Sequence, residues 1–196
     1  MKRAFDAVIS SLGLLALSPL LVVISIAVKL DSAGPVFYRG WRAGHHGKPF
    51  RIFKFRTMRA DAELVGSTST GHNDPRITRA GRWLRPAKLD ELPQLLNVIR
   101  GEMSLVGPRP EVEEHTAAYT EEEKIILSVR PGITDYSSIR FYNLSELVGS
   151  EDPHRVFVER YRAEKNRLRV EYVRNNSFWI DLKLIFRTVA RIFTWR

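Results

Sequence analysis

The sequence predicts a mainly α-helical protein with one small β-hairpin, made of an N-terminal membrane helix and a following domain. Three observations support this class. An uncharged apolar segment near the N-terminus is long enough for a membrane helix, a short stretch alternates apolar and polar residues around a turn, and the last third of the chain has no Gly or Pro after Pro153. We predict a membrane helix with its flanks at 1–30 and a cytosolic domain ending in an amphipathic helix at 31–196.

The composition points to an anionic partner. Among 196 residues, 31 Lys and Arg against 22 Asp and Glu leave a net charge of +9, which suits nucleic acid, anionic lipid or a phosphorylated substrate. The absence of cysteine excludes disulfides, Cys-ligated metals and thiol nucleophiles. The five histidines show no metal-ligand spacing. The charge alone leaves the three kinds of anionic partner open.

The apolar segment at 7–28, "AVISSLGLLALSPLLVVISIAV", would measure roughly 33 Å as a helix. It could be a cleaved signal peptide, a spanning helix, or a re-entrant helix that enters one leaflet and returns. Basic residues, which prefer the cytoplasmic side, flank both ends: Lys2 and Arg3 before the segment and Lys29 after it. In the middle, Pro19 removes one backbone hydrogen bond, and the hydroxyl of Ser18 can satisfy the freed carbonyl. These features favour a re-entrant hairpin kinked at Ser18 and Pro19.

The stretch at 34–58 predicts a β-hairpin, because apolar and polar residues alternate around a Gly-His-His-Gly-Lys turn. The polar stretch "GSTSTGHNDP" at 66–75 then predicts a loop, and its glycines lack a phosphate-loop pattern. Four arginines follow at intervals of three residues, which on a helix form a basic stripe whose simplest role is a solvated face. They are Arg76, Arg79, Arg82 and Arg85.

Two helical regions are predicted in the second half of the chain. Thr120 and Glu123 form a capping box, so a helix should begin there and end before Pro131. The final segment is mostly helical, and near its end Lys183, Arg187 and Arg191 recur every four residues among apolar side chains. Such a helix can lie on a membrane surface or pack on the core with a solvated basic face, and both interpretations stay open.

The stretch "PAKLDELPQLLN" at 86–97 places adjacent carboxylates, Asp90 and Glu91, in a basic chain. Asp90 suits an N-cap or first-turn position, and Pro93 is tolerated in a first turn, so helix capping explains the pair most simply. Nearby basic residues suggest a second role, since Arg85 precedes the pair and Arg109 is held between two prolines in "GPRP". Guanidinium groups beside carboxylates suit a site that clamps a phosphorylated substrate, where a carboxylate attacks phosphorus or holds a divalent metal.

Several motifs in order along the chain resemble the bacterial sugar transferase family. They are "KRAFD" at 2–6, "LSP" at 17–19, "VKLDSAGPVFYR" at 28–39, "KFRTM" at 54–58, "NDPRITRAGRWLR" at 73–85, "LDELPQLLNVIRGEMSLVGPRPE" at 89–111 and "RPGIT" at 130–134. The resemblance is to the small monotopic polyprenyl-phosphate phosphoglycosyl transferases, which initiate surface-glycan synthesis such as exopolysaccharide, O-antigen or capsule. It covers nearly the whole chain.

This resemblance implies an enzyme that transfers a sugar 1-phosphate from a UDP-sugar to polyprenyl (undecaprenyl) phosphate and releases UMP. It also implies a location at the cytoplasmic face of the bacterial inner membrane. In the family, the aspartate that matches Asp90 attacks the β-phosphate, and the sugar phosphate stays on the enzyme until the lipid phosphate takes it. The mechanism is therefore expected to be ping-pong, through an aspartyl sugar-phosphate.

The resemblance also assigns roles to single residues. Glu91 completes the dyad with Asp90, and the two would support Mg²⁺ as the cofactor. Arg85, Lys54 and Arg109 are expected to bind substrate. After "RPGIT" the chain reads "DYSSIRFYNL" where many members have a glycine and later an Asn-Gly-Arg-Asn run, so Arg140 is the candidate there. The expected partners are UDP-sugar, polyprenyl phosphate and the bilayer, without nucleic acid, and a homodimer is compatible with them.

A rival of another class is a non-enzymatic basic membrane protein that binds nucleic acid or anionic lipid. It predicts salt-dependent binding without turnover, with function spread over many Lys and Arg side chains. The proline-braced Arg109 favours the enzyme, because a diffuse electrostatic binder needs no fixed guanidinium.

Overall fold

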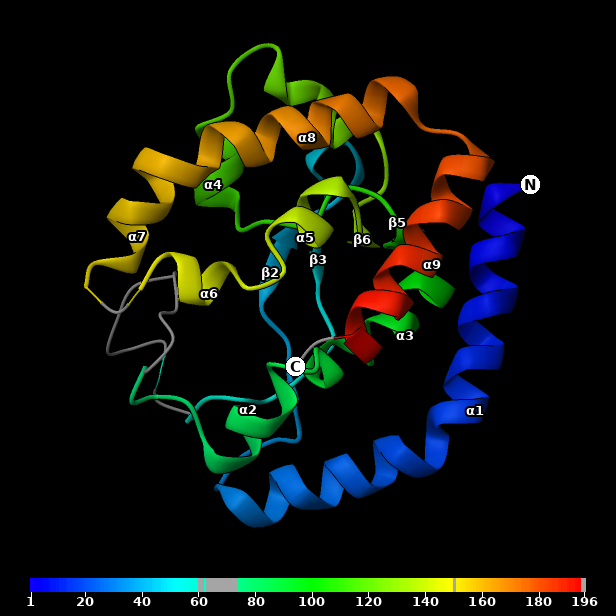
Figure 1. Cartoon of the computed structure of the whole chain (residues 1–196). Helices are drawn as coiled ribbons and strands as arrows, with labels where there is room; N and C mark the ends of the chain where they lie inside the picture. Colours follow the sequence, from blue (N-terminus) through cyan, green and yellow to red (C-terminus); the bar gives the residue numbers. More distant parts are fainter. Residues whose placement is uncertain (60–61, 63–73, 150, 195–196) are drawn as a thin grey trace.

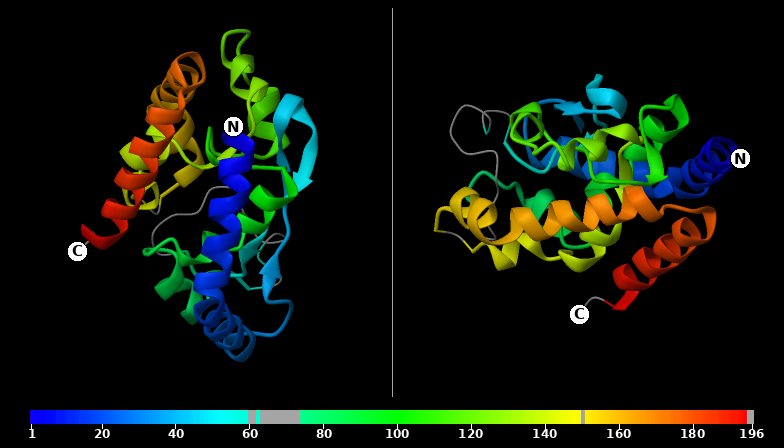
Figure 2. Two further views of the ribbon diagram at one scale, coloured as in Figure 1. Left: turned by 90° about the vertical axis from the view of Figure 1, so that its right-hand side faces the viewer. Right: turned by 90° about the horizontal axis from the view of Figure 1, so that it is seen from above.

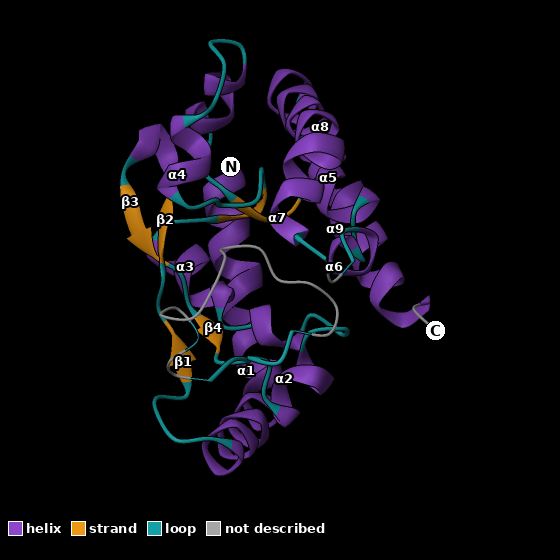
Figure 3. Cartoon of the chain, turned by 90° about the vertical axis from the view of Figure 1, so that its left-hand side faces the viewer, coloured by secondary structure: helices purple, strands orange, loops and turns teal. Residues whose placement is uncertain are grey.

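The structure, a computed structural model, describes residues 1–59, 62, 74–149 and 151–194. Helices predominate, and the strands are short, as predicted for a mainly α-helical class (Figure 3). The helices are α1 (Lys2–Asp31), α2 (Arg79–Leu84), α3 (Gln94–Arg100), α4 (Glu113–Ala117), α5 (Tyr136–Arg140), α6 (Leu144–Leu147), α7 (Pro153–Val156), α8 (Arg162–Asn175) and α9 (Phe178–Thr194). The strands are β1 (Phe37–Tyr38), β2 (Trp41–Ala43), β3 (Pro49–Arg51), β4 (Lys54–Phe55), β5 (Ser104–Val106) and β6 (Gly132–Thr134).

The N-terminal helix α1 is continuous but bent, with Pro19 inside it (Figure 1). Proline cannot donate a backbone hydrogen bond, so the carbonyl of Leu15, four residues earlier, loses its helical partner. The hydroxyl of Ser18 donates to that carbonyl oxygen at 2.8 Å. The predicted bend and the predicted compensation by serine are therefore both confirmed.

Both ends of α1 contact the rest of the chain. Near the start, the hydroxyl of Ser104 donates to the carboxylate of Asp6 at 2.7 Å. At the end, the carboxylate of Asp31 accepts the backbone N–H of Ala80 at 2.9 Å. Between them, many apolar side chains are uncovered, and Leu15 is 73% exposed. The rest of the chain lies inside the bend (Figures 1 and 2), so the two ends face the same body of the protein.

The predicted β-hairpin is present and forms two short antiparallel ladders, β2 with β3 and β1 with β4. Its turn takes the left-handed backbone conformation at His46 and Gly47, with φ of 54° and 73°. The second ladder pairs Tyr38 with Lys54 and so fixes Lys54 on a strand. The hairpin thus positions Lys54, one of the predicted substrate-binding residues, towards the interior of the protein.

A parallel pair, β5 with β6, was not predicted. It joins the "VGPRP" and "RPGIT" motifs, where two backbones approach so closely that a Cβ on Gly132 would lie 2.1 Å from the nitrogen of Gly107. The N–H of Gly107 donates to Thr134 at 2.9 Å, and the N–H of Gly132 donates to Pro108 at 2.9 Å. Only glycine fits here, and the contact holds the segment that carries Arg109.

Two helix predictions need correction. Of the four arginines, only Arg79 and Arg82 lie within α2, while Arg76 precedes the helix and pairs with Asp74 through contacts as short as 2.6 Å. The capping box of Thr120 and Glu123 is confirmed by reciprocal bonds of 2.9 and 3.2 Å, but it opens a 3₁₀ turn rather than an α-helix. Most of the loop predicted at 66–75 lies outside the described residues.

The C-terminal segment is helical as predicted. Helix α9 buries Leu184, whereas Trp179 is 75% exposed and Phe186 is 66% exposed, so one face packs and another is uncovered. Near its start, Asp181 pairs with Lys2 and accepts a 2.6 Å hydrogen bond from the hydroxyl of Tyr172 on α8. The first and last helices are therefore joined directly.

Candidate active site

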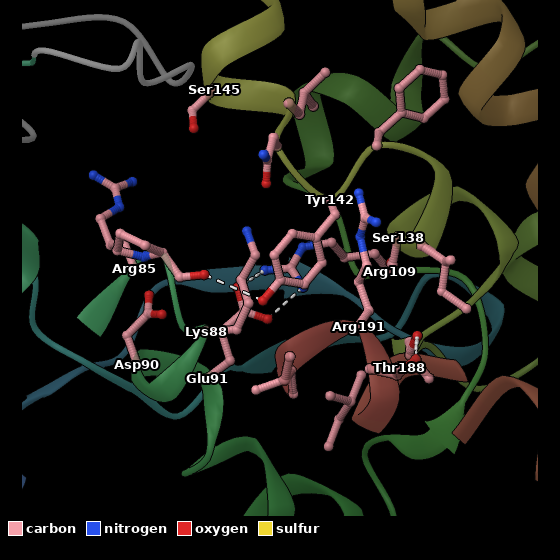
Figure 4. A pocket seen from close by; sticks show the side chains of 18 of the residues that line it. Arg85, Lys88, Asp90, Glu91, Arg109, Ser138, Tyr142, Ser145, Thr188 and Arg191 are labelled. Carbon is pink, nitrogen blue, oxygen red and sulfur yellow. Dashed lines mark hydrogen bonds and ion pairs between the residues drawn. The ribbon is translucent and has the colours of Figure 1, made fainter. Parts of the chain in front are cut away.

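A pocket of about 760 Å³ lies between the segment that precedes α3, the ends of β5 and β6, and helices α5, α6 and α9. Figure 4 shows side chains from these elements converging on it. The structure brings together five of the residues singled out from the sequence, although they come from separate elements. They are Lys54, Arg85, Asp90, Glu91 and Arg109.

The carboxylate pair lies in a 3₁₀ turn, Leu89–Glu91, that precedes α3. Of the two predicted positions for Asp90, the N-cap is wrong, because α3 begins at Gln94 with Pro93 in the cap position, whereas the first-turn position is confirmed in the 3₁₀ turn. No capping hydrogen bond joins the Asp90 side chain to the described backbone. Because α3 begins only after Pro93, neither carboxylate of the dyad caps this helix, and both can contact other side chains or a ligand.

Glu91 and Arg109 form a forked ion pair. Nη1 of Arg109 donates to Oε2 of Glu91 at 2.6 Å, and Nη2 donates to Oε1 at 2.5 Å. Burial alone would raise the pKa of Glu91, but the charges of Arg109 and Lys54 outweigh it and hold the pKa well below its usual range. Glu91 therefore stays ionised and orients Arg109 at the pocket wall.

Asp90 is 1% exposed and lines the same pocket. Nζ of Lys54 lies 2.7 Å from Oδ2 of Asp90 and 3.5 Å from Oε1 of Glu91, so one ammonium bridges the dyad. Among the described residues, neither Asp90 oxygen accepts a hydrogen bond with good geometry. Asp90 differs in this from Glu91, both of whose oxygens are held by Arg109.

Arg85 also lines the pocket near Asp90 (Figure 4). Its Nη1 is buried and has no hydrogen-bond partner among the described residues. Burial lowers the pKa of Arg85, against the opposing effect of the Asp90 charge. A buried guanidinium that lacks one hydrogen-bond acceptor binds an anion favourably, because the anion supplies that acceptor.

Arg140 does not reach this pocket. Its side chain is 66% exposed, and its Nε lies 3.6 Å from the carboxylate of Glu164. The two residues that flank it, Ile139 and Phe141, line the pocket instead. Helix α5 turns Arg140 outward, so the structure gives no support to the predicted substrate contact.

Four further residues that line the pocket were not predicted as site residues. These are Lys88, Tyr142, Lys165 and Arg191. Two of them carry a signal in the sequence: Lys88 lies two residues before Asp90, and Arg191 belongs to the basic row on the last helix. Lys165 lies beside Glu111 at 3.4 Å, and burial followed by the charge of Arg169 lowers the pKa of Lys165 to about 8. Nothing in the local sequence signals its burial.

The two carboxylates fit a magnesium ion that arrives with a substrate. Among the described residues, no three His, Asp or Glu side chains converge as a metal site. Mg²⁺ keeps several waters and is commonly held by one or two carboxylates together with substrate phosphates. Oδ1 of Asp90 has no partner among the described residues, and Glu91 lies next to Asp90, so this donor set suits a metal shared with a diphosphate rather than a closed protein site.

Comparison with known proteins agrees with this arrangement. The profile of the bacterial sugar transferase family matches residues 1–195. An undecaprenyl-phosphate glucose phosphotransferase of Komagataeibacter xylinus is 45% identical over 197 residues, which cover 97% of this chain and 35% of the relative. A UDP-glucose:undecaprenyl-phosphate glucose-1-phosphate transferase of Escherichia coli K12 is 40% identical over 196 residues, which cover 98% of this chain and 40% of the relative.

The similar proteins differ in how much longer they are than this chain. It spans 35% and 40% of the two relatives above, but 70% of a third, the UDP-glucose:undecaprenyl-phosphate glucose-1-phosphate transferase of Caulobacter vibrioides, which is 40% identical over 198 residues. In each case the match covers at least 97% of this chain, including the apolar helix and the dyad. The chain belongs to the bacterial sugar transferase family.

Proposed function

We propose that the protein transfers a sugar 1-phosphate from a UDP-sugar to a polyprenyl phosphate and releases UMP. The observation that carries this proposal is the state of Asp90, a buried carboxylate without hydrogen bonds from the described chain, in a pocket lined by cations. The cations face a pocket rather than an open surface, which favours a small phosphorylated ligand over nucleic acid. The names of the relatives make UDP-glucose the first donor to test.

In the proposed first half-reaction, a carboxylate oxygen of Asp90 attacks the β-phosphorus of the donor. The new O–P bond forms as the bond to the α-phosphate oxygen breaks, so UMP leaves and a sugar phosphate remains on Asp90. Lys54 forms an ion pair with the attacking carboxylate. As Asp90 loses its charge in the reaction, the Lys54 ammonium would contact a phosphate oxygen instead. Arg85, with a free buried nitrogen, would bind the diphosphate.

In the second half-reaction, an oxygen of the polyprenyl phosphate attacks the same phosphorus, and the bond to Asp90 breaks. Asp90 returns as a carboxylate, and the product is a polyprenyl diphosphate sugar. Arg109, fixed by Glu91 at the pocket wall, would stabilise the charge that builds on the phosphoryl oxygens. A bound Mg²⁺, held by Asp90 or Glu91 and the donor phosphates, would neutralise the diphosphate and assist departure of UMP.

A membrane location supports the same function, because the acceptor phosphate lies at a bilayer surface. By its length and composition, helix α1 could enter a membrane. A signal sequence or the core helix of a soluble protein can have the same length and composition. A core helix would be covered, whereas only 11% of the most apolar window of α1 is buried. We propose that α1 is re-entrant in the bacterial inner membrane, with the pocket on the cytoplasmic side and the exposed face of α9 on the lipid surface.

The function is tested by separating the two half-reactions. Purified protein incubated with UDP-glucose labelled in the sugar, without lipid, should release UMP once per active site and retain the label on the protein. Addition of undecaprenyl phosphate should then move the label to lipid, and EDTA should prevent UMP release without lowering the melting temperature. A panel of other UDP-sugars serves as the control for donor choice. Absence of both UMP release and protein label with every donor would contradict the proposal.

The re-entrant topology predicts that both ends of α1 lie in the cytoplasm. The chain has no cysteine, so single cysteines at the exposed positions Ala4 and Leu30 can be probed directly. Neither should react with an impermeant maleimide added to intact spheroplasts, and both should react after permeabilisation. Replacing Pro19 by Leu restores a helical N–H, so this variant should straighten α1 and expose one end outside. Labelling of a single end in the Pro19-containing protein would exclude the hairpin.

A further inference from the structure

Lys88 has an unusual backbone for its residue type. It adopts the left-handed conformation, with φ of 55°, immediately before the turn that carries the dyad. A lysine in this region is strained, and such strain persists where the surrounding structure enforces it. The conformation sends a long cationic side chain into the pocket, where burial lowers the pKa of Lys88 against the effect of Glu91.

Lys88 and Arg191 both lie against the ring of Tyr142. Nζ of Lys88 is 5.1 Å from the ring centroid, and the guanidinium carbon of Arg191 is 5.9 Å from it. The Tyr142 hydroxyl donates to the carbonyl of Pro86 at 3.2 Å, which holds the ring in place. An aromatic face thus holds two cations at one end of the pocket.

Lys88 and Arg191 differ from Lys54 and Arg109 in having no carboxylate partner among the described residues. Lys54 is paired with Asp90 and Arg109 with Glu91. Within the described part of the chain, neither Lys88 nor Arg191 forms an ion pair. Two positive charges beside one ring repel each other, and an anion bound next to both would offset that repulsion. The arrangement therefore forms an anion site separate from the groups that already neutralise the dyad.

The surroundings of this site are apolar. Leu92 and Leu95 line the pocket, and so do Val189 and Ile192 of α9. Leu95 also reaches α1, since its Cδ1 lies 3.5 Å from the position of a Cβ on Gly13. Val189 is 47% exposed and Ile192 is 37% exposed on the uncovered face of α9. An apolar wall thus runs from the cations to the two helices proposed to meet lipid.

We infer that Lys88 and Arg191 bind the phosphate of the polyprenyl acceptor, whose chain lies along this apolar wall. The inference rests on the proposed function and assigns one of its substrates to particular residues. A phosphate joined to a hydrocarbon chain matches a cationic site next to an apolar wall. A UDP-sugar is polar along its whole length and would gain little from that wall.

Ping-pong kinetics can separate the two substrates, because each kcat/KM reports its own half-reaction. Lys88→Gln and Arg191→Gln should each lower kcat/KM for undecaprenyl phosphate in mixed micelles by about 10- to 100-fold, the range for a lost charged hydrogen bond. The yield and rate of protein labelling by UDP-glucose should not change. Lys88→Arg should recover most of the loss. Lys124→Gln, at an exposed lysine paired with Glu121 on the surface, is the matched control and should have no effect.

Three outcomes would overturn the inference. The first is a fall in kcat/KM for UDP-glucose with an unchanged value for the acceptor, which would make this a donor site. The second is equal loss in both half-reactions, which would indicate a structural role. The third is no change in either. Failure of the parental protein to label with any UDP-sugar would instead count against the proposed function, so the two failures are distinguishable.

Discussion

Replacing Asp90 by asparagine should abolish the covalent sugar phosphate and reduce turnover by roughly 10⁴-fold or more, as the loss of a nucleophile does. Asparagine keeps the shape of aspartate but lacks the anionic oxygen that attacks phosphorus. The measurement is retention of radioactive sugar on the protein after a short incubation with UDP-glucose, followed by UMP release with lipid present.

The asparagine variant should still fold, because Asp90 accepts no hydrogen bond of good geometry from the described residues, and Lys54, its ion-pair partner, also lies 3.5 Å from Glu91. Its melting temperature in detergent should therefore lie close to that of the parental protein. Glu121→Gln is the matched control, since the Glu121 side chain is 90% exposed, and it should label fully. A labelled Asp90→Asn protein would assign the nucleophile to another residue.

Replacing Arg109 by methionine should impair both stability and turnover. Glu91 would keep its buried position without the forked partner that neutralises it. Breaking a buried ion pair on one side costs about 3 kcal/mol at the lower end of the measured range. The lower end applies because the Arg109 side chain is 30% exposed. Thermal unfolding in detergent measures the loss, and turnover should fall by about 100-fold or more through the lost phosphoryl contact.

The pH dependence supplies an independent check on Arg109. In the parental protein the pKa of Glu91 is lowered, so its stabilising contribution is present above the unfolded pKa of about 4.3 and is lost as the pH falls below it. Without Arg109, burial should raise the pKa of Glu91 and make its charge unfavourable at neutral pH.

The difference in melting temperature between the parental protein and Arg109→Met should therefore widen as the pH rises from about 4 to 7. Adding Glu91→Gln to Arg109→Met removes the unpaired charge and should recover part of the stability, although not the activity. A difference that is independent of pH would show that Arg109 stabilises the protein by packing alone.

Features set by neighbouring residues could be predicted from the sequence. The hairpin at 34–58 follows from alternation around a turn, and the bend in α1 follows from the backbone chemistry of Pro19 and Ser18. The cations around the dyad were also expected, because the family motifs carry them. For the hairpin and the bend, the signal lies within a few residues of the structure that it specifies.

The features that could not be predicted depend on contacts between segments that are distant in the sequence. The pairing of β5 with β6 needs two glycines 25 residues apart to face each other, and neither motif alone indicates it. The capping role expected for Asp90 failed because a 3₁₀ turn and Pro93 move the helix start beyond the dyad. The conformation of Lys88 could not be foreseen, since a lysine carries no preference for positive φ. Arg140 failed for a similar reason, because the direction of a side chain on a short helix depends on how the helix packs.

The link between Lys2 and Asp181 has a consequence for synthesis of the protein. Helix α1 leaves the ribosome before α9, because Asp181 on α9 emerges about 180 residues after Lys2, roughly ten seconds or more at ordinary elongation rates. During that interval nothing from the last helix can hold the two arms of α1 together. The Pro19 bend and the Ser18 hydrogen bond are encoded within α1 itself, so the nascent helix can take its bent shape before α9 has been synthesised.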